Sequence, residues 1–285
     1  MNGTLMICAC AKLNLYLDIT GVRADGYHLL DMVMQSVSLA DKVTLSVYSG
    51  EGVTVSCDAP CIPSGERNIA YKAAEGFLKA AGISAAVDIK IEKNIPSGAG
   101  MGGGSADAAA VLAGLNRLSG YPLGAAEMNA LAVQIGADVP FCLTGGTKIC
   151  CGIGEEISQA ASVRDRYFAV VMPDFTCPTG EAYARYDGSP LPSKNALEEF
   201  CGALPHGFEG KMYNAFEALY ADERIERIKR TLLEHGAKGA MLTGSGAAVF
   251  GVFDAEEKAA QACSALPQYF TAVCEPTDKG VIFIE

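Results

Sequence analysis

A glycine-rich segment between a predicted strand and a predicted helix is the part of the sequence best suited to bind an anion. Residues 95–110 read IPSGAGMGGGSADAAA, with five glycines between positions 98 and 104. Glycines let a ligand approach the main chain, and the first turn of the helix predicted over 105–118 presents unpaired N–H groups. The segment therefore predicts a phosphate site, with Ser105 as the N-cap or as a hydroxyl that faces a phosphate or its metal.

Two known phosphate-binding loops differ from this segment. The P-loop pattern GxxxxGK[ST] requires a lysine, and none follows these glycines. Gly98, Gly100 and Gly103 match the GxGxxG spacing of dinucleotide-binding folds, but the surrounding sequence does not alternate strand and helix as a parallel sheet would. A flexible glycine turn without a ligand is the remaining alternative.

Three other stretches place polar side chains where they could act on a ligand. In ICACAKLNLYLDI, alternation puts Lys12 and Asn14 on the same side of a strand, which faces either a cleft or solvent. Tyr27 and His28 follow a turn and could stack on and hydrogen-bond a heterocycle, or be ordinary partly buried residues. Asp138, in IGADVPF, could accept a proton from a substrate hydroxyl or serve as a structural turn residue.

The composition argues against several classes of function. The chain has 285 residues and a formal net charge of −11 without a Lys/Arg block, unlike a non-specific nucleic-acid binder. No apolar stretch approaches the ~20 residues that cross a bilayer, and the N-terminal stretch lacks the basic segment of a secretory signal. The eleven cysteines are scattered without metal-site spacing. We therefore expect reduced thiols in a cytoplasmic protein that binds neither nucleic acid nor a membrane.

The pattern of predicted elements indicates an α+β protein with two domains, residues 1–155 and 156–285, and a cleft between them. In the first domain, residues 32–48 resemble a hairpin, and NIAYKAAEGFLKAA predicts a helix that ends before a glycine. The second domain has the order β-α-β-β-α-β, typical of a ferredoxin-like layer, with a long helix within 216–236.

These segments together resemble one family, the GHMP small-molecule kinases, which includes galactokinase, homoserine kinase and mevalonate kinase. The loop IPSGAGMGGGSADAAA is similar to the second motif of the family, and LTGSGAAVFG at residues 242–251 is similar to the third. The stretches AKLNLYLDITGVRADGYHLLDMVMQSVSLADKV, RNIAYKAA, IGADVPF and PTGEAY are similar to members that act on a cytidine diphosphate-linked alcohol. The resemblance spans nearly the whole chain.

The resemblance implies a two-domain, GHMP-kinase-like architecture and a reaction. The γ-phosphoryl group of ATP would pass to the 2-hydroxyl of a cytidine diphosphate-linked methylerythritol, in non-mevalonate isoprenoid biosynthesis. Asp138 would be the base, and Lys12 would polarise or orient the hydroxyl. The cytosine would stack between two tyrosines, and the substrate-binding residues would be Asn14, Tyr27, His28 and Tyr183.

The resemblance also implies a site for ATP and for Mg²⁺, for which Ser105 is the candidate ligand. The residues that match the nucleotide site of the family are Asn68, Ile69, Lys93, Pro96, Ser97, Gly98, Ala99, Gly100, Met101, Gly102, Gly103, Gly104, Ser105 and Ala106.

The third motif departs from the family pattern, because Thr243 replaces a common serine and Ala247–Ala248 replaces Pro–Ser/Thr. Asn214 also lacks the acidic residue that often follows it. The alternatives are another GHMP kinase and a catalytically silent nucleotide-binding sensor. DGYH and Tyr183 argue against the first, since mevalonate and homoserine offer no base to stack on, and the intact catalytic motifs argue against the second. We expect a monomer or a weak homodimer.

Overall fold

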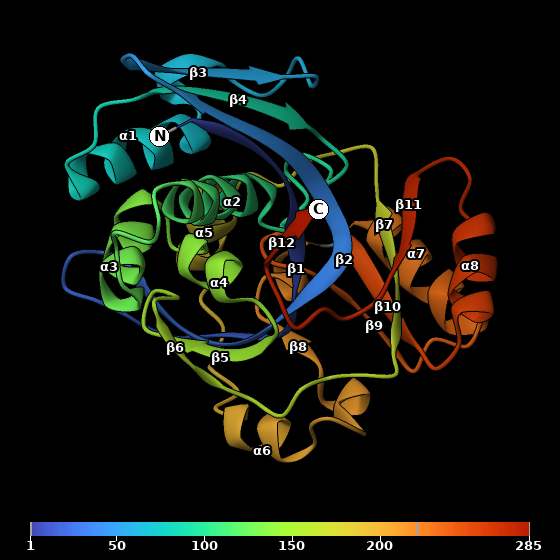
Figure 1. Ribbon diagram of the computed structural model, residues 1–285. Coiled ribbons are helices and arrows are strands. Elements are labelled where there is room, and N and C mark those ends of the chain that lie inside the picture. Colours follow the sequence, from blue (N-terminus) through green and yellow to red (C-terminus); the bar gives the residue numbers. More distant parts are fainter. Residues whose placement is uncertain (1, 221, 285) are drawn as a thin grey trace.

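The computed structural model describes residues 2–220 and 222–284, which form two β-sheets with helices packed around them (Figure 1). The mixture of helices and strands confirms the predicted α+β class. The strands are β1 Gly3–Val22, β2 His28–Tyr48, β3 Gly52–Cys57, β4 Ala86–Glu92, β5 Thr147–Cys151, β6 Glu156–Gln159, β7 Tyr167–Met172, β8 Tyr213–Asn214, β9 Gly239–Leu242, β10 Val249–Phe253, β11 Phe270–Cys274 and β12 Val281–Ile284. The helices are α1 Ile69–Ala81, α2 Gly103–Leu118, α3 Ala125–Ile135, α4 Val139–Thr144, α5 Thr179–Gly188, α6 Leu197–Gly202, α7 Glu223–Glu234 and α8 Glu256–Ser264.

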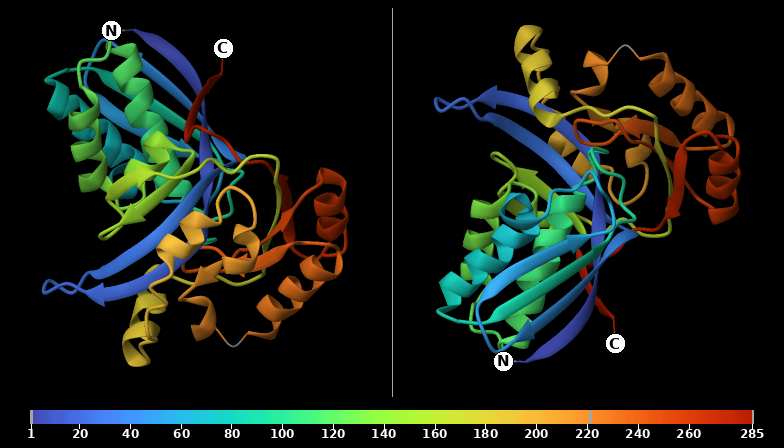
Figure 2. Two further views of the ribbon diagram at one scale, coloured as in Figure 1. Left: turned by 90° about the horizontal axis from the view of Figure 1, so that it is seen from below. Right: turned by 90° about the horizontal axis from the view of Figure 1, so that it is seen from above.

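The larger sheet is built around a long ribbon of the two strands β1 and β2. These strands pair antiparallel from Gly3 opposite Val47 to Val22 opposite His28. The turn that joins them projects from the body of the molecule (Figure 2). The sheet has the order β12-β1-β2-β4-β3, with β5 and β6 attached beside β2, and β8 attached to β1. The ribbon therefore forms the middle of the sheet, and other strands pair along both of its edges.

The predicted hairpin over residues 32–48 is wrong, because β2 runs through this stretch as one strand. Its first part, Met32–Gln35, pairs with β5, and its second part, Lys42–Tyr48, pairs with β4. Asp41 lies where the partner strand changes. Its buried carboxylate accepts two backbone N–H groups of the segment after β4, at 2.7 and 2.8 Å. The polar residues at this change of partner resemble a turn in the sequence although the backbone stays extended.

The smaller sheet has the antiparallel order β11-β7-β10-β9. Along the chain, α7 lies between β7 and β9, and α8 lies between β10 and β11. This β-α-β-β-α-β arrangement confirms the prediction of a ferredoxin-like layer. The strands β6, β8 and β12 follow residue 155 in the chain but join the larger sheet. The domain boundary at residue 155 stays a prediction.

The predicted long helix within residues 216–236 is divided. A 3-10 turn over Glu217–Leu219 comes first, and α7 begins only at Glu223. The Asp222 side chain accepts the backbone N–H of Arg224 at 2.9 Å, which satisfies an otherwise unpaired donor at the start of the helix. Residue 221 lies outside the described part of the chain.

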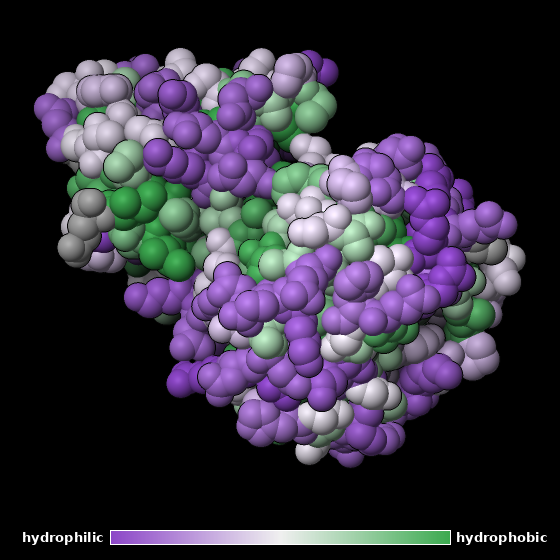
Figure 3. Space-filling view, turned by 90° about the vertical axis from the view of Figure 1, so that its right-hand side faces the viewer, coloured by the Kyte–Doolittle hydropathy of each residue, from purple (hydrophilic) through white to green (hydrophobic). Residues whose placement is uncertain are grey.

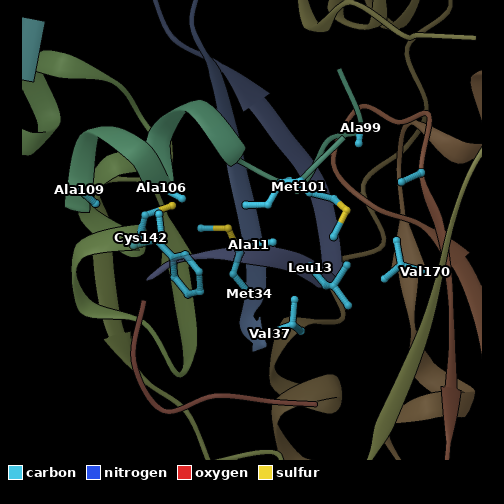
Figure 4. Close-up of a cluster of buried hydrophobic side chains, with 14 of the residues drawn as sticks. Ala11, Leu13, Met34, Val37, Ala99, Met101, Ala106, Ala109, Cys142 and Val170 are labelled. Atoms are coloured by element: carbon cyan, nitrogen blue, oxygen red, sulfur yellow. The ribbon is translucent and has the colours of Figure 1, made fainter. Parts of the chain in front are cut away.

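The hydrophobic core extends from α2 across the glycine loop to the smaller sheet. Figure 4 shows buried side chains of these regions in one cluster, among them Ala106 of α2, Met101 of the loop, Leu13 of β1 and Val170 of β7. Ala99 and Met101 are 2% and 1% exposed. These two apolar side chains anchor the loop in the core, so its glycines can form the wall of a binding site without leaving the loop loose.

The surface that carries α8 is mostly hydrophilic, with hydrophobic residues in separate patches (Figure 3). No helix among the described residues is long and apolar enough to cross a membrane. The eleven cysteines are free, and burial raises the pKa of Cys10 and Cys151 to about 11. Such thiols stay protonated at neutral pH and are poor nucleophiles.

Candidate active site

A cavity of about 840 Å³ lies between the two parts of the fold and is lined by residues from both. The glycine loop, β1 and the start of α4 line one side, and α5 and the turn after β9 contribute from the other part of the chain. The predicted cleft is therefore present. The predicted site residues that line it are Lys12, Asn14, Tyr27, His28, Ile69, Lys93, Asp138, Tyr183 and residues 96–105.

The glycine loop leads into the first turn of α2, and that end of the helix faces the cavity. The helix begins at Gly103 with Gly102 as its N-cap, so the prediction of Ser105 as the N-cap is wrong. Gly102 has a φ of 70°, a left-handed conformation that glycine adopts without strain. The N–H of Ala106 donates to the Gly102 carbonyl at 2.8 Å, which leaves the N–H groups of residues 103–105 without helical partners. This end of α2 can therefore bind an anion.

The glycine loop packs against a second glycine turn through backbone atoms. The N–H groups of Ala247–Ala248 donate to the carbonyl oxygens of Gly98–Ala99 at 3.3 and 3.2 Å. A Cβ at Gly100, which has a φ of 73°, would overlap the carbonyl oxygen of Thr243. Some glycines of the loop thus allow the two parts of the fold to meet, and others leave the main chain open to a ligand.

Lys12 and Asp138 face each other beside the glycine loop. Lys12 Nζ lies 3.9 Å from Asp138 Oδ2 and donates to Asn14 Oδ1 at 2.6 Å and to the Gly100 carbonyl at 2.7 Å. The lysine side chain is 5% exposed and the aspartate 33%. Asp138 precedes α4 without capping it. The ammonium is therefore held in place, whereas the carboxylate can still accept a proton or a hydrogen bond from a ligand.

Irregular pairing of β1 with β2 surrounds Lys12 and Asn14. The register shifts between Cys10 and Lys12 and again between Asn14 and Tyr16. Such bulges are common next to active sites, where they re-aim side chains. The backbone N–H of Lys12 also donates to the Met101 carbonyl at 3.0 Å, which ties β1 to the glycine loop. The prediction that Lys12 and Asn14 share one side of the strand is confirmed, and that side faces the cavity.

The residues predicted to hold a base lie along the same cavity, but one face of Tyr183 is already covered. His28 stacks on Tyr183 with ring centroids 4.5 Å apart and an interplanar angle of 25°. His28 Nε2 lies 2.7 Å from Asp187 Oδ1. Tyr27 is 59% exposed beside the turn of the ribbon. In this conformation a base would meet the His28–Asp187 pair as well as the two tyrosines.

Lys93 is bound by two carboxylates where β4 meets the start of α2. Its Nζ forms ion pairs with Asp41 and, at 2.8 Å, with Asp107 Oδ2, and the side chain is 7% exposed. Burial, together with the nearby Asp41 carboxylate, raises the pKa of Asp107 to about 7 although Lys93 lowers it. The ammonium fixes the strand to the helix at the edge of the cavity. Its role as an ATP ligand stays a prediction.

Two residues predicted at the ATP site do not line the cavity. Asn68 is 4% exposed and is the N-cap of α1. Its side chain accepts the N–H of Ala70 and donates to the Pro63 carbonyl, both at 2.8 Å. Ala106 is fully buried, and its N–H makes the first hydrogen bond of α2. In the structure both residues build elements that carry the site.

Asn68→Ala is expected to lower the free energy of unfolding by ~1 kcal/mol and to leave the KM for ATP unchanged, because it removes a helix cap. Urea unfolding and steady-state kinetics check both parts. Ser64→Ala is a matched control, since Ser64 precedes a 3-10 turn without a side-chain cap. A raised KM for ATP at unchanged stability would instead place Asn68 in the nucleotide site.

Several lining residues were not predicted from the sequence, and six of them come from the later part of the chain: Thr179, Gly180, Asp187, Phe216, Gly244 and Ser245. The Thr179 and Ser245 hydroxyl oxygens lie 3.1 Å apart, so α5 meets the second glycine turn here. The motifs PTGEAY and TGSG contain four of the six, whereas nothing local marks Asp187 or Phe216. Over residues 2–220 and 222–284, no group of three or more His, Cys, Asp or Glu side chains could hold a metal.

Family models match both parts of the chain. The model for the GHMP kinases N terminal domain matches residues 68–146, and the model for the GHMP kinases C terminal matches residues 208–272. A relative from Clostridium tetani, named 4-diphosphocytidyl-2-C-methyl-D-erythritol kinase, is 41% identical over 261 residues, which cover 90% of this chain and 93% of the relative. The chain belongs to the GHMP kinase family. The predicted family is therefore confirmed, and with it the use of ATP as phosphoryl donor that a kinase of this family implies.

Other relatives of this GHMP kinase carry the same name. The one from Acetivibrio thermocellus is 39% identical and covers 92% of this chain and 95% of its own. A crystal structure named 4-(cytidine 5'-diphospho)-2C-methyl-D-erythritol kinase superposes with a TM-score of 0.81 at 32% identity, over 95% of this chain and 99% of that chain. Homoserine kinase from Cytophaga hutchinsonii has a TM-score of 0.78 over 99% of this chain and 97% of its own, but only 20% identity, so it supports the fold alone.

Proposed function

We propose that this GHMP kinase transfers the γ-phosphoryl group of ATP to the 2-hydroxyl of 4-diphosphocytidyl-2-C-methyl-D-erythritol, in the non-mevalonate synthesis of isoprenoid precursors. Relatives of that name at about 40% identity over most of the chain support the substrate. One structural observation carries the proposal. The Lys12–Asp138 pair and the N-terminus of α2 open into the same cavity as an aromatic group formed by Tyr27, His28 and Tyr183.

The geometry supports a division of roles in phosphoryl transfer. The triphosphate would bind at the N-terminus of α2, where three backbone N–H groups are available. Asp138 would accept the proton of the substrate hydroxyl. The oxygen of that hydroxyl would form a bond to the γ-phosphorus, while the bond from the γ-phosphorus to the bridging oxygen of ADP breaks. Lys12, held by Asn14 and Gly100, would stabilise the negative charge on the reacting oxygens.

Mg²⁺ is part of the proposal, and an oxygen donor suited to it is present. The predicted ligand Ser105 lines the cavity in the first turn of α2. Mg²⁺ usually takes one or two protein oxygens together with substrate phosphates and water, so a site without an all-protein cage fits this ion. When bound, it would neutralise charge on the phosphates. The proposed enzyme is a cytoplasmic monomer or weak homodimer.

Tyr27→Ala is expected to raise the KM for the cytidine substrate roughly tenfold and to leave the KM for ATP little changed, because stacking on a base contributes ~1–3 kcal/mol. Steady-state kinetics with each substrate varied in turn measure the split. Tyr121→Ala is a matched control, because this tyrosine is 66% exposed and does not line the cavity. A selective defect toward ATP would place Tyr27 in the nucleotide site.

The site of phosphorylation tests the proposed reaction itself. After incubation with ATP, Mg²⁺ and the cytidine substrate, ³¹P and ¹³C NMR of the product should show a new phosphomonoester coupled to carbon 2 of the methylerythritol. A phosphate on any other hydroxyl would require a different placement of the substrate relative to Asp138.

A further inference from the structure

One edge of β1 has no partner strand where Lys12 and Asn14 lie. Along that edge, β12 pairs with residues 6–9 and β8 pairs with Tyr16–Leu17. Among the described strands, none pairs with the residues between them on this side. Backbone N–H groups in a buried interval need acceptors from elsewhere in the chain. The source of those acceptors therefore determines how the part of β1 that carries Lys12 and Asn14 is held.

Two loops supply the acceptors for these two residues. The N–H of Lys12 donates to the carbonyl of Met101, in the glycine loop, at 3.0 Å. The N–H of Asn14 donates to the side-chain oxygen of Thr243, in the second glycine turn, also at 3.0 Å. Any residue type supplies a backbone carbonyl, whereas a hydroxyl at this place depends on the side chain. The bond to Asn14 can therefore be removed by changing Thr243 alone.

Thr243 also packs against the second group that holds the Lys12 ammonium. Lys12 Nζ donates to Asn14 Oδ1 at 2.6 Å and to the Gly100 carbonyl at 2.7 Å. Thr243 binds the N–H of Asn14 through its hydroxyl, and its own carbonyl lies where a Cβ on Gly100 would be. The threonine is fully buried, and a β-branched side chain has few rotamers, so its hydroxyl is held in one direction. Both acceptors of the ammonium are thus fixed at one residue.

We propose that Thr243 is a positioning residue that holds the Lys12 ammonium in place for phosphoryl transfer; the inference rests on the proposed function. Thr243 does not line the cavity, so it acts through Asn14 and Gly100. Without the hydroxyl, the buried N–H of Asn14 loses its acceptor, and this part of β1 must move to find another. Because the ammonium stabilises charge that develops during the transfer, the displacement should lower kcat more than it raises either KM.

The test compares Thr243→Val with Thr243→Ser in the whole chain, by steady-state kinetics with Mg-ATP and the cytidine substrate. Valine keeps the shape of threonine and removes the hydroxyl, whereas serine keeps the hydroxyl. Thr243→Val should lower kcat by at least ~10-fold and change both KM values by less than ~3-fold, since small misplacements near the reacting groups are costly. Thr243→Ser should retain kcat within ~3-fold of the wild type, because the acceptor for Asn14 remains.

Thr147→Val is the matched control. Thr147 is 3% exposed, its hydroxyl oxygen accepts the N–H of Val163 at 2.9 Å, and it does not line the cavity. This variant loses an equivalent buried hydrogen bond, so urea unfolding should show reduced stability while kcat stays unchanged. If Thr243→Val behaved like this control, its role would be merely structural and the inference would be overturned. An equal loss of kcat in Thr243→Ser would overturn it as well. Should Thr243→Val not fold, Thr243→Ala takes its place, because alanine differs from serine by the hydroxyl alone.

Lys12→Met shows whether Thr243 acts through the lysine. Residues that act as a unit have non-additive effects, so adding Thr243→Val to Lys12→Met should lower the single-turnover rate by less than ~3-fold. A further loss of ~10-fold or more would mean that Thr243 acts independently of Lys12, against the inference. Wild-type turnover of the cytidine substrate upholds the proposed function whatever these variants do. If the wild type phosphorylates another alcohol instead, the same comparison is made with that alcohol, and a wild type that phosphorylates none overturns both proposals.

Discussion

Asp138→Asn is expected to reduce kcat/KM by at least ~10²-fold, because the amide cannot accept the proton of the substrate hydroxyl. The exchange is nearly isosteric, and Asp138 makes no capping hydrogen bond whose loss would unfold α4. The affinity for ATP and the free energy of unfolding should therefore stay close to those of the wild type. Steady-state kinetics with Mg-ATP and the cytidine substrate, together with calorimetric ATP binding, measure each quantity.

Asp254→Asn is a suitable control for this substitution. Asp254 is also a partly exposed aspartate paired with a lysine, since its Oδ2 lies 3.0 Å from Lys238 Nζ, but it does not line the cavity. It should retain full activity. Turnover of Asp138→Asn within a few-fold of the wild type would remove Asp138 from the proton transfer and leave Lys12 and the α2 N-terminus as the main catalytic groups.

Among the Gly→Ala substitutions in the glycine loop, Gly100→Ala should be the most damaging to stability and activity. Gly100 has a φ of 73°, and an added Cβ would overlap the Thr243 carbonyl of the second glycine turn. Backbone atoms cannot rotate away, so the two loops must separate. We expect the free energy of unfolding to fall by ~2–4 kcal/mol, from the conformational cost together with the overlap. The same Gly100 carbonyl binds Lys12, so kcat/KM should also fall by at least ~10-fold, a loss of about 1.4 kcal/mol in transition-state stabilisation.

Gly82→Ala separates the cost of placing alanine in a left-handed conformation from the cost of the overlap between the two glycine turns. Gly82 ends α1 with a φ of 64°, and nothing lies within 4 Å of an added Cβ. Its replacement should cost only about 1 kcal/mol of stability and leave the kinetics unchanged. Urea unfolding and steady-state kinetics of both variants provide the comparison. If the two variants behaved alike, the contact between the glycine turns would not matter for stability or activity.

Local signals predict helices well in this chain and strand partners poorly. The bounds of α1 follow from Asn68, whose side chain caps the first turn, and from Gly82, which adopts the left-handed conformation after the last turn. Both depend on neighbours in the sequence. In contrast, β2 could not be predicted as one strand, because its continuity depends on β4 and β5, which follow far along the chain. The return of β12 to β1 is likewise a non-local pairing.

The parts of the site could be predicted from the sequence, but their contacts could not. The alternation of side chains along the strand predicted that Lys12 and Asn14 share one side. The family motifs identified Asp138 as the candidate base and the glycine loop as the candidate phosphate site. Nothing in the sequence near Asp187 shows that it binds His28, which lies 159 positions earlier. Such details depend on how distant elements pack.

Substrate-dependent ADP release tests the central claim most directly. The protein is incubated with Mg-ATP and, separately, with 4-diphosphocytidyl-2-C-methyl-D-erythritol, mevalonate or homoserine. We predict turnover with the cytidine compound alone. Turnover with mevalonate or homoserine would be compatible with the proposed phosphate site at α2 but would contradict the proposed cytosine site. ATP binding without turnover of any alcohol would contradict the assignment as a kinase for these substrates and favour a nucleotide sensor.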